Sequence, residues 1–286
     1  MEDRHVVEIA GTQAVIRDGK VVEIGESSIT FCPFAKRFES PINPVSQETV
    51  QKNIEHRIYS FGMCTRNREV LAIESMVLFG ASELLSTSLR NGALDAVVIC
   101  CDGAGTVIVT SPELVQGIGG RMSGLIATVP YAEVIAEIEN AGGIVIDKEQ
   151  ASLDVLQGVR IAKERGFKKI AVTVAGFQTE RAEKIRELYP DTVIIGVHTS
   201  GISSKEEAVR LCKAADLVFA CASKYIREVV GAFAQIQGGV SIPVFATSKS
   251  GKRIIIEQLL ETSEPVLVKN MQLPVYDMGK QPEPLI

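Results

Sequence analysis

Six cysteines carry the most distinctive chemistry of this chain, which has 286 residues, three histidines and no tryptophan. Thiolates bind iron–sulfur clusters and Zn²⁺ tightly but bind Mg²⁺ poorly. Four of the cysteines lie in predicted loops or at strand ends: Cys32, Cys64, Cys101 and Cys221. Together they could hold a 4Fe-4S cluster or, as the less favoured alternative, a tetrahedral zinc ion. No Cys-x-x-Cys pair occurs, so such a site would have to be assembled from distant segments.

The remaining two cysteines favour structural roles. Cys100 and Cys101 are neighbours on a predicted strand, so their side chains point to opposite faces and only one can join a given site. Cys101 is nearer the carboxyl end and is the better candidate. Cys212 lies inside a predicted helix, where a small core residue is expected. A buried, inert thiol stays the alternative for each of the other cysteines.

Polar residues also follow several apolar strands of the pattern. The carboxyl ends of parallel strands meet at one edge of a sheet, where ligands bind. A glycine-rich loop at 117–124 could add backbone amides and an arginine fork for an anion. It matches neither the phosphate loop of nucleotide hydrolases nor the dinucleotide fingerprint. The resulting candidates for cofactor or substrate binding are Asp102, Gly103, Gly119, Gly120, Arg121, His198 and Lys224.

Each of these candidates has a structural alternative. His198 could be a general base or a ligand, or simply a hydrogen-bonded residue at a strand end. Lys224 could bind an anion or remain solvated. The glycines could serve tight turns alone. The pattern assigns no catalytic residue, although Cys101 with Asp102 could supply a nucleophile and an orienting acid.

The elements that must position these residues fall into two groups. Residues 6–24 predict a β-hairpin, 47–59 a helix and 68–90 a long helix. From residue 95 to about 261, apolar strands alternate with helices, which predicts a parallel sheet covered on both faces. About six parallel strands are too few to close a (β/α)₈ barrel. We therefore expect an α/β fold with a Rossmann-like, mostly parallel sheet, preceded by the small N-terminal hairpin and helical segment.

Three regions follow from this pattern. Residues 1–92 hold the hairpin, the cysteine-bearing loops and helices, and residues 93–264 form the Rossmann-like domain. Residues 265–286 carry four prolines and predict an extended tail.

Composition narrows the class of protein. Hydrophobic residues make up 46% and charged residues 23%, as in ordinary globular proteins. The net charge of −5 argues against a nucleic-acid partner, because phosphate binding needs a cationic face. No signal-peptide pattern and no apolar run of membrane-spanning length occurs. We therefore expect a cytoplasmic protein with reduced thiols and no membrane partner.

Long strings of the sequence are similar to one known family, methanogenesis marker protein 8. They are CPFAKRF at 32–38, NIEHRIYSFGMCT at 53–65, VICCDGAGTVIVTSPELVQGIGGRMSGL at 98–125, KKIAVTVA at 168–175, GVHTSGIS at 196–203 and CASKYIRE at 221–228. Weaker similarity covers the hairpin and the region to about 261, and the proline-rich tail lies outside it.

The resemblance implies a cytoplasmic protein of methane-metabolising archaea. It suggests an accessory role near methyl-coenzyme M reductase, its nickel cofactor or its activation, with that enzyme or its maturation factors as partners. A homo-oligomer is compatible with this reading. The four candidate cysteines fall inside the family strings and Cys212 does not, which favours a four-thiolate site.

Two further functions remain open. One is a small-molecule enzyme that binds an anionic substrate at the carboxyl edge of the sheet, with Cys101 or Asp102 doing the chemistry. The other is a scaffold that only binds protein partners.

Overall fold

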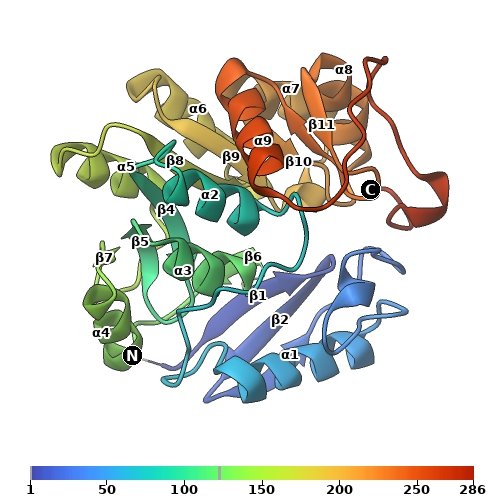
Figure 1. Cartoon of the computed structure of the whole chain (residues 1–286). Helices are drawn as coiled ribbons and strands as arrows, with labels where there is room; N and C mark the ends of the chain where they lie inside the picture. The colour runs from blue at the N-terminus through green and yellow to red at the C-terminus, as the bar shows by residue number, and fades with distance from the viewer. Residues whose placement is uncertain (1, 122–123) are drawn as a thin grey trace.

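The computed structural model describes residues 2–121 and 124–286, which form a small sheet and a large sheet (Figure 1). The small sheet has the strand order β3-β2-β1-β6, and neighbouring strands are antiparallel. Its strands are β1 (His5–Ile9), β2 (Thr12–Arg17), β3 (Lys20–Ile24) and β6 (Gly124–Ala127). The predicted hairpin is confirmed by the pairing of Arg17 with Lys20 across the Asp18-Gly19 turn. The fourth strand, β6, comes from the middle of the chain and was not predicted.

Helix α1 (Gln47–Phe61) covers the small sheet. It begins where the hydroxyl of Ser46 accepts the Thr49 amide at 3.2 Å, and it ends at Gly62, whose φ of +72° favours glycine. Val50 and Ile54 pack from this helix into the same apolar cluster as Val7. The predicted helix is thus confirmed, with its end two residues later.

The large sheet has eight strands in the order β11-β12-β10-β9-β8-β4-β5-β7. They are β4 (Ala96–Cys101), β5 (Gly105–Val109), β7 (Ile144–Val145), β8 (Ile170–Ala175), β9 (Val193–Val197), β10 (Leu217–Phe219), β11 (Ile236–Gly238) and β12 (Val244–Ala246). Only the central run β4-β8-β9-β10 is parallel, and the remaining pairs are antiparallel. The sheet is therefore mixed rather than mostly parallel, because β5, β11 and β12 run antiparallel to the strands with which they pair. The α/β class is confirmed, whereas the Rossmann-like arrangement stays a prediction.

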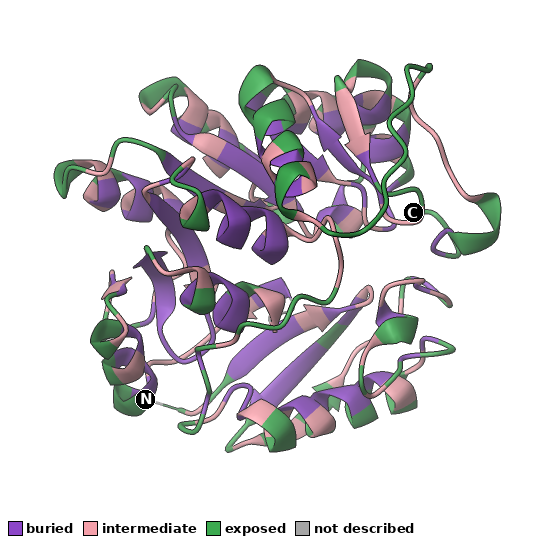
Figure 2. Cartoon of the chain, in the orientation of Figure 1, coloured by how far each residue is buried: buried purple, intermediate pink, exposed green. Residues whose placement is uncertain are grey.

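Helices cover both faces of the large sheet, as the continuous apolar strands predict. One face packs against α2 (Ala81–Arg90), α3 (Pro112–Val115), α4 (Ala132–Asn140) and α9 (Lys249–Glu261). The other packs against α5 (Val155–Glu164), α6 (Thr179–Leu188) and α7 (Lys205–Ala214). The short α8 (Gly231–Phe233) follows a wider helical turn at Ile226–Val230. Figure 2 shows the central strands buried between these layers.

The predicted long helix over 68–90 is wrong in its first half. Only 81–90 is helical, and residues 69–79 run as an extended connection (Figure 1). Its amides bond outside the segment: the Ala72 amide donates to the Glu113 carbonyl at 3.1 Å, and the Met76 amide donates to the buried Glu83 carboxylate at 2.9 Å. These partners replace the bonds that a helix would have made.

Helix α5 begins at Val155, because the side chain of Asp154 caps it by accepting the Gln157 amide. Asp147 accepts the amides of Glu149 and Gln150 in a preceding turn.

The last residues form an extended and mostly exposed segment (Figure 2). This segment returns to the loops that carry Cys32 and Cys221. Glu283 exchanges backbone hydrogen bonds with Phe31, and Ile286 pairs with Ala222 and Lys224. This segment is therefore anchored at its far end. Within the described ranges, no helix is long and apolar enough to cross a membrane.

Candidate functional site

The two cysteine-bearing loops fold over the carboxyl edge of the parallel strands. The Cys64 loop meets the end of β4, where the Cys64 amide donates to Asp102 Oδ2 at 2.6 Å. The Cys32 loop meets the end of β10, where Ala222 joins the apolar cluster that contains Cys32. The small sheet lies against the same edge, since Glu8 of β1 lies 3.8 Å from His198 at the end of β9. The polar strand ends therefore meet the N-terminal elements in two separate groups.

The first group, which we call the core group, consists of Cys64, Arg68, Cys101, Asp102 and Tyr131. Arg68 Nε donates to both oxygens of Asp102, at 3.0 and 3.2 Å, and each of these side chains is at most 1% exposed. Arg68 also donates to the Gly117 carbonyl at 3.0 Å. The guanidinium and the carboxylate thus neutralise each other in the interior and join the β4 end to the loop after α1.

Neither thiol of the core group is ready to ionise. Burial raises the pKa of Cys64 and of Cys101 well above the ordinary value, and the nearby Asp102 charge raises both further. Both side chains are fully buried. A buried thiol in such surroundings is inert, so the geometry does not support Cys101 as a nucleophile.

A hydrogen-bonded network that the sequence did not indicate flanks the core group. His5 is fully buried and places its ring nitrogens 2.8 Å from Thr128 Oγ1 and 2.9 Å from the Tyr131 hydroxyl. That hydroxyl donates to Asp3 Oδ2 at 2.6 Å, and Thr128 accepts the Gly103 amide at 2.8 Å. Gly103 is therefore placed in a structural turn, with φ of +82°.

The second group, the junction group, consists of Glu8, Cys32, His198, Cys221 and Arg227. His198 and Glu8 are half-buried, with 33% and 26% of their side chains exposed. Cys221 is also half-buried, whereas Cys32 is buried. Arg227 donates to the Cys221 carbonyl at 2.6 Å and holds the loop on which this thiol lies. The junction group therefore offers a thiol, an imidazole and a carboxylate that are partly open to solvent.

Burial sets the protonation states in the junction group. It lowers the pKa of His198, although the Glu8 charge acts in the opposite direction, so the imidazole is neutral at neutral pH. It raises the pKa of Cys221 and of Cys32. The Cys32 sulfur accepts the Ala35 amide at 3.4 Å, which partly offsets that rise. At neutral pH the group therefore holds protonated thiols and a neutral imidazole.

Backbone strain also marks this edge. Cys64, His198 and Cys221 have φ of +56°, +50° and +43°, in the left-handed region that residues other than glycine rarely adopt. Each such residue costs about 1–3 kcal/mol, which the surrounding contacts must offset. Strain of this kind is concentrated at functional sites, and two of these three residues belong to the junction group.

The remaining predicted binding residues do not form an open anion cradle. Gly119 and Gly120 lie within a helical turn at Gln116–Gly120. Arg121 pairs with Glu69 at 3.1 Å and stacks on Phe61. Met122 and Ser123 of the same predicted loop lie outside the described residues.

Lys224 follows Cys221 closely on the exposed rim. Its Nζ lies 5.0 Å from the centre of the Tyr225 ring. The lysine thus stands beside the junction group, and no carboxylate of the described residues forms an ion pair with it.

The four candidate thiols stand in two pairs. Cys64 and Cys101 influence each other electrostatically in the core group, and Cys32 influences Cys221 in the junction group. Among the described residues, no group of three or more His, Cys, Asp or Glu side chains is placed to hold a metal ion. This arrangement does not fit a single four-thiolate site for 4Fe-4S or zinc, which needs all four sulfurs around one centre.

The sequence pattern also missed Glu8, Arg68 and Arg227. Glu8 did leave a signal, because it is a charged residue between the apolar residues Val7 and Ile9 of the strand HVVEI. Arg68 and Arg227 lie in predicted helices, where a charged residue is typical of a solvated face, and nothing in their spacing indicated burial.

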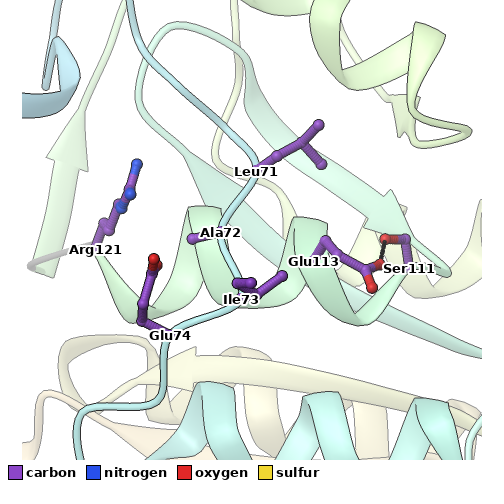
Figure 3. Close-up of a pocket in the computed structure, with 7 residues that line it drawn as sticks. All are labelled: Leu71, Ala72, Ile73, Glu74, Ser111, Glu113 and Arg121. Carbon is purple, nitrogen blue, oxygen red and sulfur yellow. Dashed lines mark hydrogen bonds between the residues drawn. The ribbon is translucent and has the colours of Figure 1, made fainter.

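One pocket shares no residue with either group. It has a volume of about 490 Å³ and is lined by Leu71, Ala72, Ile73, Glu74, Ser111, Glu113 and Arg121 (Figure 3). Two of its charged groups are engaged, since Glu113 accepts the Ser111 hydroxyl at 2.5 Å and Arg121 pairs with Glu69. It contains no thiol and no imidazole, so the junction group is the better candidate for chemistry.

Comparison with known proteins gives a consistent assignment. Residues 5–260 match the model of a family described as uncharacterized proteins conserved in archaea (DUF2099). An uncharacterized protein of Methanocaldococcus jannaschii is 44% identical over 289 residues. That match covers 99% of this chain and 100% of the relative, so it extends beyond the family model into the proline-rich tail. With most of its length matched by both comparisons, this chain belongs to the DUF2099 family of proteins conserved in archaea.

Proposed function

We propose that the protein is an enzyme acting on a small molecule at the junction group, with Cys221 as the nucleophile. His198 is the general base that takes the thiol proton, and Glu8 orients the imidazole. The observation that carries the proposal is that a half-buried cysteine and a half-buried histidine, both on strained backbone, follow the adjacent parallel strands β10 and β9, with the Glu8 carboxylate 3.8 Å from the imidazole.

The protonation states support this assignment of roles. A thiol whose pKa is raised by burial is a weak nucleophile until a base removes its proton. An imidazole whose pKa is lowered by burial is already neutral at neutral pH and can accept that proton. The Glu8 carboxylate, 3.8 Å from His198 Nδ1, stabilises the imidazolium that results.

The fold supports the position of the site. Ligands bind beyond the carboxyl ends of parallel strands, and β9 and β10 both end at this group. Arg227 fixes the Cys221 loop through the Cys221 and Ala220 carbonyls, at 2.6 and 3.2 Å. Lys224 on the adjacent rim supplies a positive charge for the anionic substrate expected from the sequence.

Alkylation of Cys221 by iodoacetamide, followed by peptide mass spectrometry across pH 6 to 10, tests the proposal. We expect His198→Asn to lower the labelling rate of Cys221 about 10²-fold at pH 7.5, the lower end of what a general base contributes. The rates of wild type and variant should converge only above the pKa of Cys221, which burial raises beyond the ordinary thiol value of 9.0, because the thiol then ionises without help. His56→Asn, away from the junction group, is the matched control. Equal Cys221 rates in wild type and His198→Asn at pH 7.5 would show that His198 is not the base.

A second candidate function is an accessory role in methanogenesis with methyl-coenzyme M reductase or its maturation factors as partners. The resemblance of the long sequence strings supports it, and the relative from Methanocaldococcus jannaschii is compatible with it. We derive no iron–sulfur step, because the paired thiols do not fit one cluster. Affinity capture from an anaerobic extract of the native cell, with iron and sulfide analysis of the purified protein, tests this role. Recovery of the protein without these partners would count against it.

A further inference from the structure

We infer that Cys32 is the second thiol of a dithiol pair with Cys221, and that the pair reduces a small organic disulfide. The inference rests on the proposed function and names its substrate class. In this reaction Cys221 attacks first and Cys32 resolves the mixed disulfide.

One short segment ties the two thiol-bearing loops together. The amides of Thr30 and Phe31 donate to the Glu283 carbonyl at 2.6 and 3.1 Å, next to Cys32. Three residues further on, the Ile286 amide donates to the Ala222 carbonyl at 2.9 Å, next to Cys221. Residues 283–286 therefore tie the backbone next to Cys32 to the backbone next to Cys221.

Shared charged neighbours support the same pairing. Arg227 acts on both thiols, and its guanidinium favours the thiolate of each. The Glu8 charge also acts on both thiols, in the opposite direction, since it raises the pKa of each. Ala222 and Cys32 belong to one continuous apolar cluster, so no other layer of the fold separates the two loops.

Exposure decides the order of attack. Cys221 is half-buried and can reach a bound ligand, whereas Cys32 is 8% exposed and can reach only a sulfur delivered to it. A half-buried nucleophile also favours a small disulfide over one embedded in a folded protein, because the attacked sulfur must lie in line with the thiolate.

The reaction balances in two steps. His198 accepts the Cys221 proton, the thiolate attacks one sulfur of RSSR, and the S–S bond breaks to give a mixed disulfide and RS⁻, which takes the proton from His198 and leaves as RSH. Cys32 then attacks the Cys221 sulfur, and its proton passes to the second departing thiolate. The sum is RSSR and two protein thiols giving one Cys32–Cys221 disulfide and two RSH, with the small disulfide as the oxidant.

The experiment treats the full-length reduced protein with 2-hydroxyethyl disulfide, which is neutral, and with oxidised glutathione, which is anionic. Released thiol is counted per chain and the protein disulfides are mapped by mass spectrometry. Wild type and the Cys212→Ser control should release two equivalents and hold a Cys32–Cys221 bond. Cys32→Ser should release one equivalent and keep the mixed disulfide on Cys221, and Cys221→Ser should release none from this site.

The outcomes separate the two proposals. A stable mixed disulfide on wild-type Cys221, or a disulfide mapped to Cys64 and Cys101, overturns the dithiol inference and leaves the proposed nucleophile in place. A Cys221 that reacts with neither disulfide and is not alkylated by iodoacetamide overturns both. Circular dichroism of each serine variant, compared with wild type, shows that the fold is retained.

Discussion

The Cys64 amide donates a 2.6 Å hydrogen bond to Asp102 Oδ2, and this bond joins the loop after α1 to the end of β4. The same carboxylate accepts two bonds from Arg68. One aspartate therefore fixes the loop, the guanidinium and the strand end in the interior. Its role is to hold the N-terminal elements against the large sheet, rather than to bind a ligand.

Replacement of this aspartate should be strongly destabilising. Asp102→Asn leaves the fully buried Arg68 guanidinium without its counter-charge, and breaking a buried pair in this way costs about 3–5 kcal/mol of unfolding free energy. Urea denaturation of both proteins measures the loss. Glu133→Gln removes the exposed partner of Arg66 and should leave the midpoint unchanged. Equal midpoints for Asp102→Asn and wild type would contradict the assigned role.

The close contact at Gly117 gives a second prediction. A Cβ at this position would lie 2.1 Å from the Val70 carbonyl oxygen, which belongs to backbone and cannot rotate away. Gly117→Ala should therefore lower the unfolding free energy by about 1–3 kcal/mol through overpacking. Gly201→Ala, which meets nothing within 4 Å, should stay within about 0.5 kcal/mol of wild type. Thermal melts of the two variants measure the difference in stability. Similar melting temperatures for Gly117→Ala and Gly201→Ala would refute the close packing of residues 69–72.

Stability should fall as the solution is acidified below neutral. Burial lowers the pKa of His5 beneath its ordinary value of 6.5, although Asp102 and Asp3 act against this shift. Between the lowered value and 6.5 the unfolded chain binds more protons, so the unfolding free energy decreases as pH falls. His198 contributes in the same direction. The double variant His5→Asn/His198→Asn should flatten the slope of unfolding free energy between pH 7 and 5, and an unchanged slope would show that neither residue causes it.

The anchored tail gives a fourth prediction. Removal of residues 281–286 deletes the carbonyl partners of the Phe31 and Lys224 amides. Both amides should then exchange their hydrogens faster with solvent, and Cys32 should be alkylated faster by iodoacetamide. Hydrogen–deuterium exchange with mass spectrometry measures the first effect. Met278→Ala, at a side chain that is 80% exposed, should change neither rate. Unaltered exchange at Phe31 after the deletion would show that the tail does not secure this loop.

Local signals predicted much of the fold. Ser46 and Gly62 bound α1 through capping geometry that depends only on nearby residues, and the Asp18-Gly19 turn sets the hairpin. The helix predicted over the segment 69–79 was wrong, because the amides of this segment bond to Phe61, Glu83 and Glu113 rather than along the chain. Tertiary partners of this kind leave no periodicity to detect.

The candidate site was only partly predicted, because part of it depends on contacts between segments that are distant in the sequence. Strand ends indicated the edge to which Cys101, His198 and Cys221 belong, since that follows from strand direction alone. Whether the sulfurs meet depends on where the loops carrying Cys32 and Cys64 cross that edge. They cross it at β10 and β4, which are separated by two strands. That distance divides the thiols into two pairs, and no spacing in the sequence encodes it.

Strand β6 bears on how the molecule could be divided. After α3 the chain leaves the large sheet, forms β6 beside β1 and then returns to the large sheet at α4. A fragment ending at residue 92 would lack this strand and would expose the edge of β1. The unpaired backbone amides and carbonyls of that edge can form hydrogen bonds with other chains. Expression of that fragment should therefore yield aggregates, because the small sheet is completed only by a strand that the chain forms between α3 and α4.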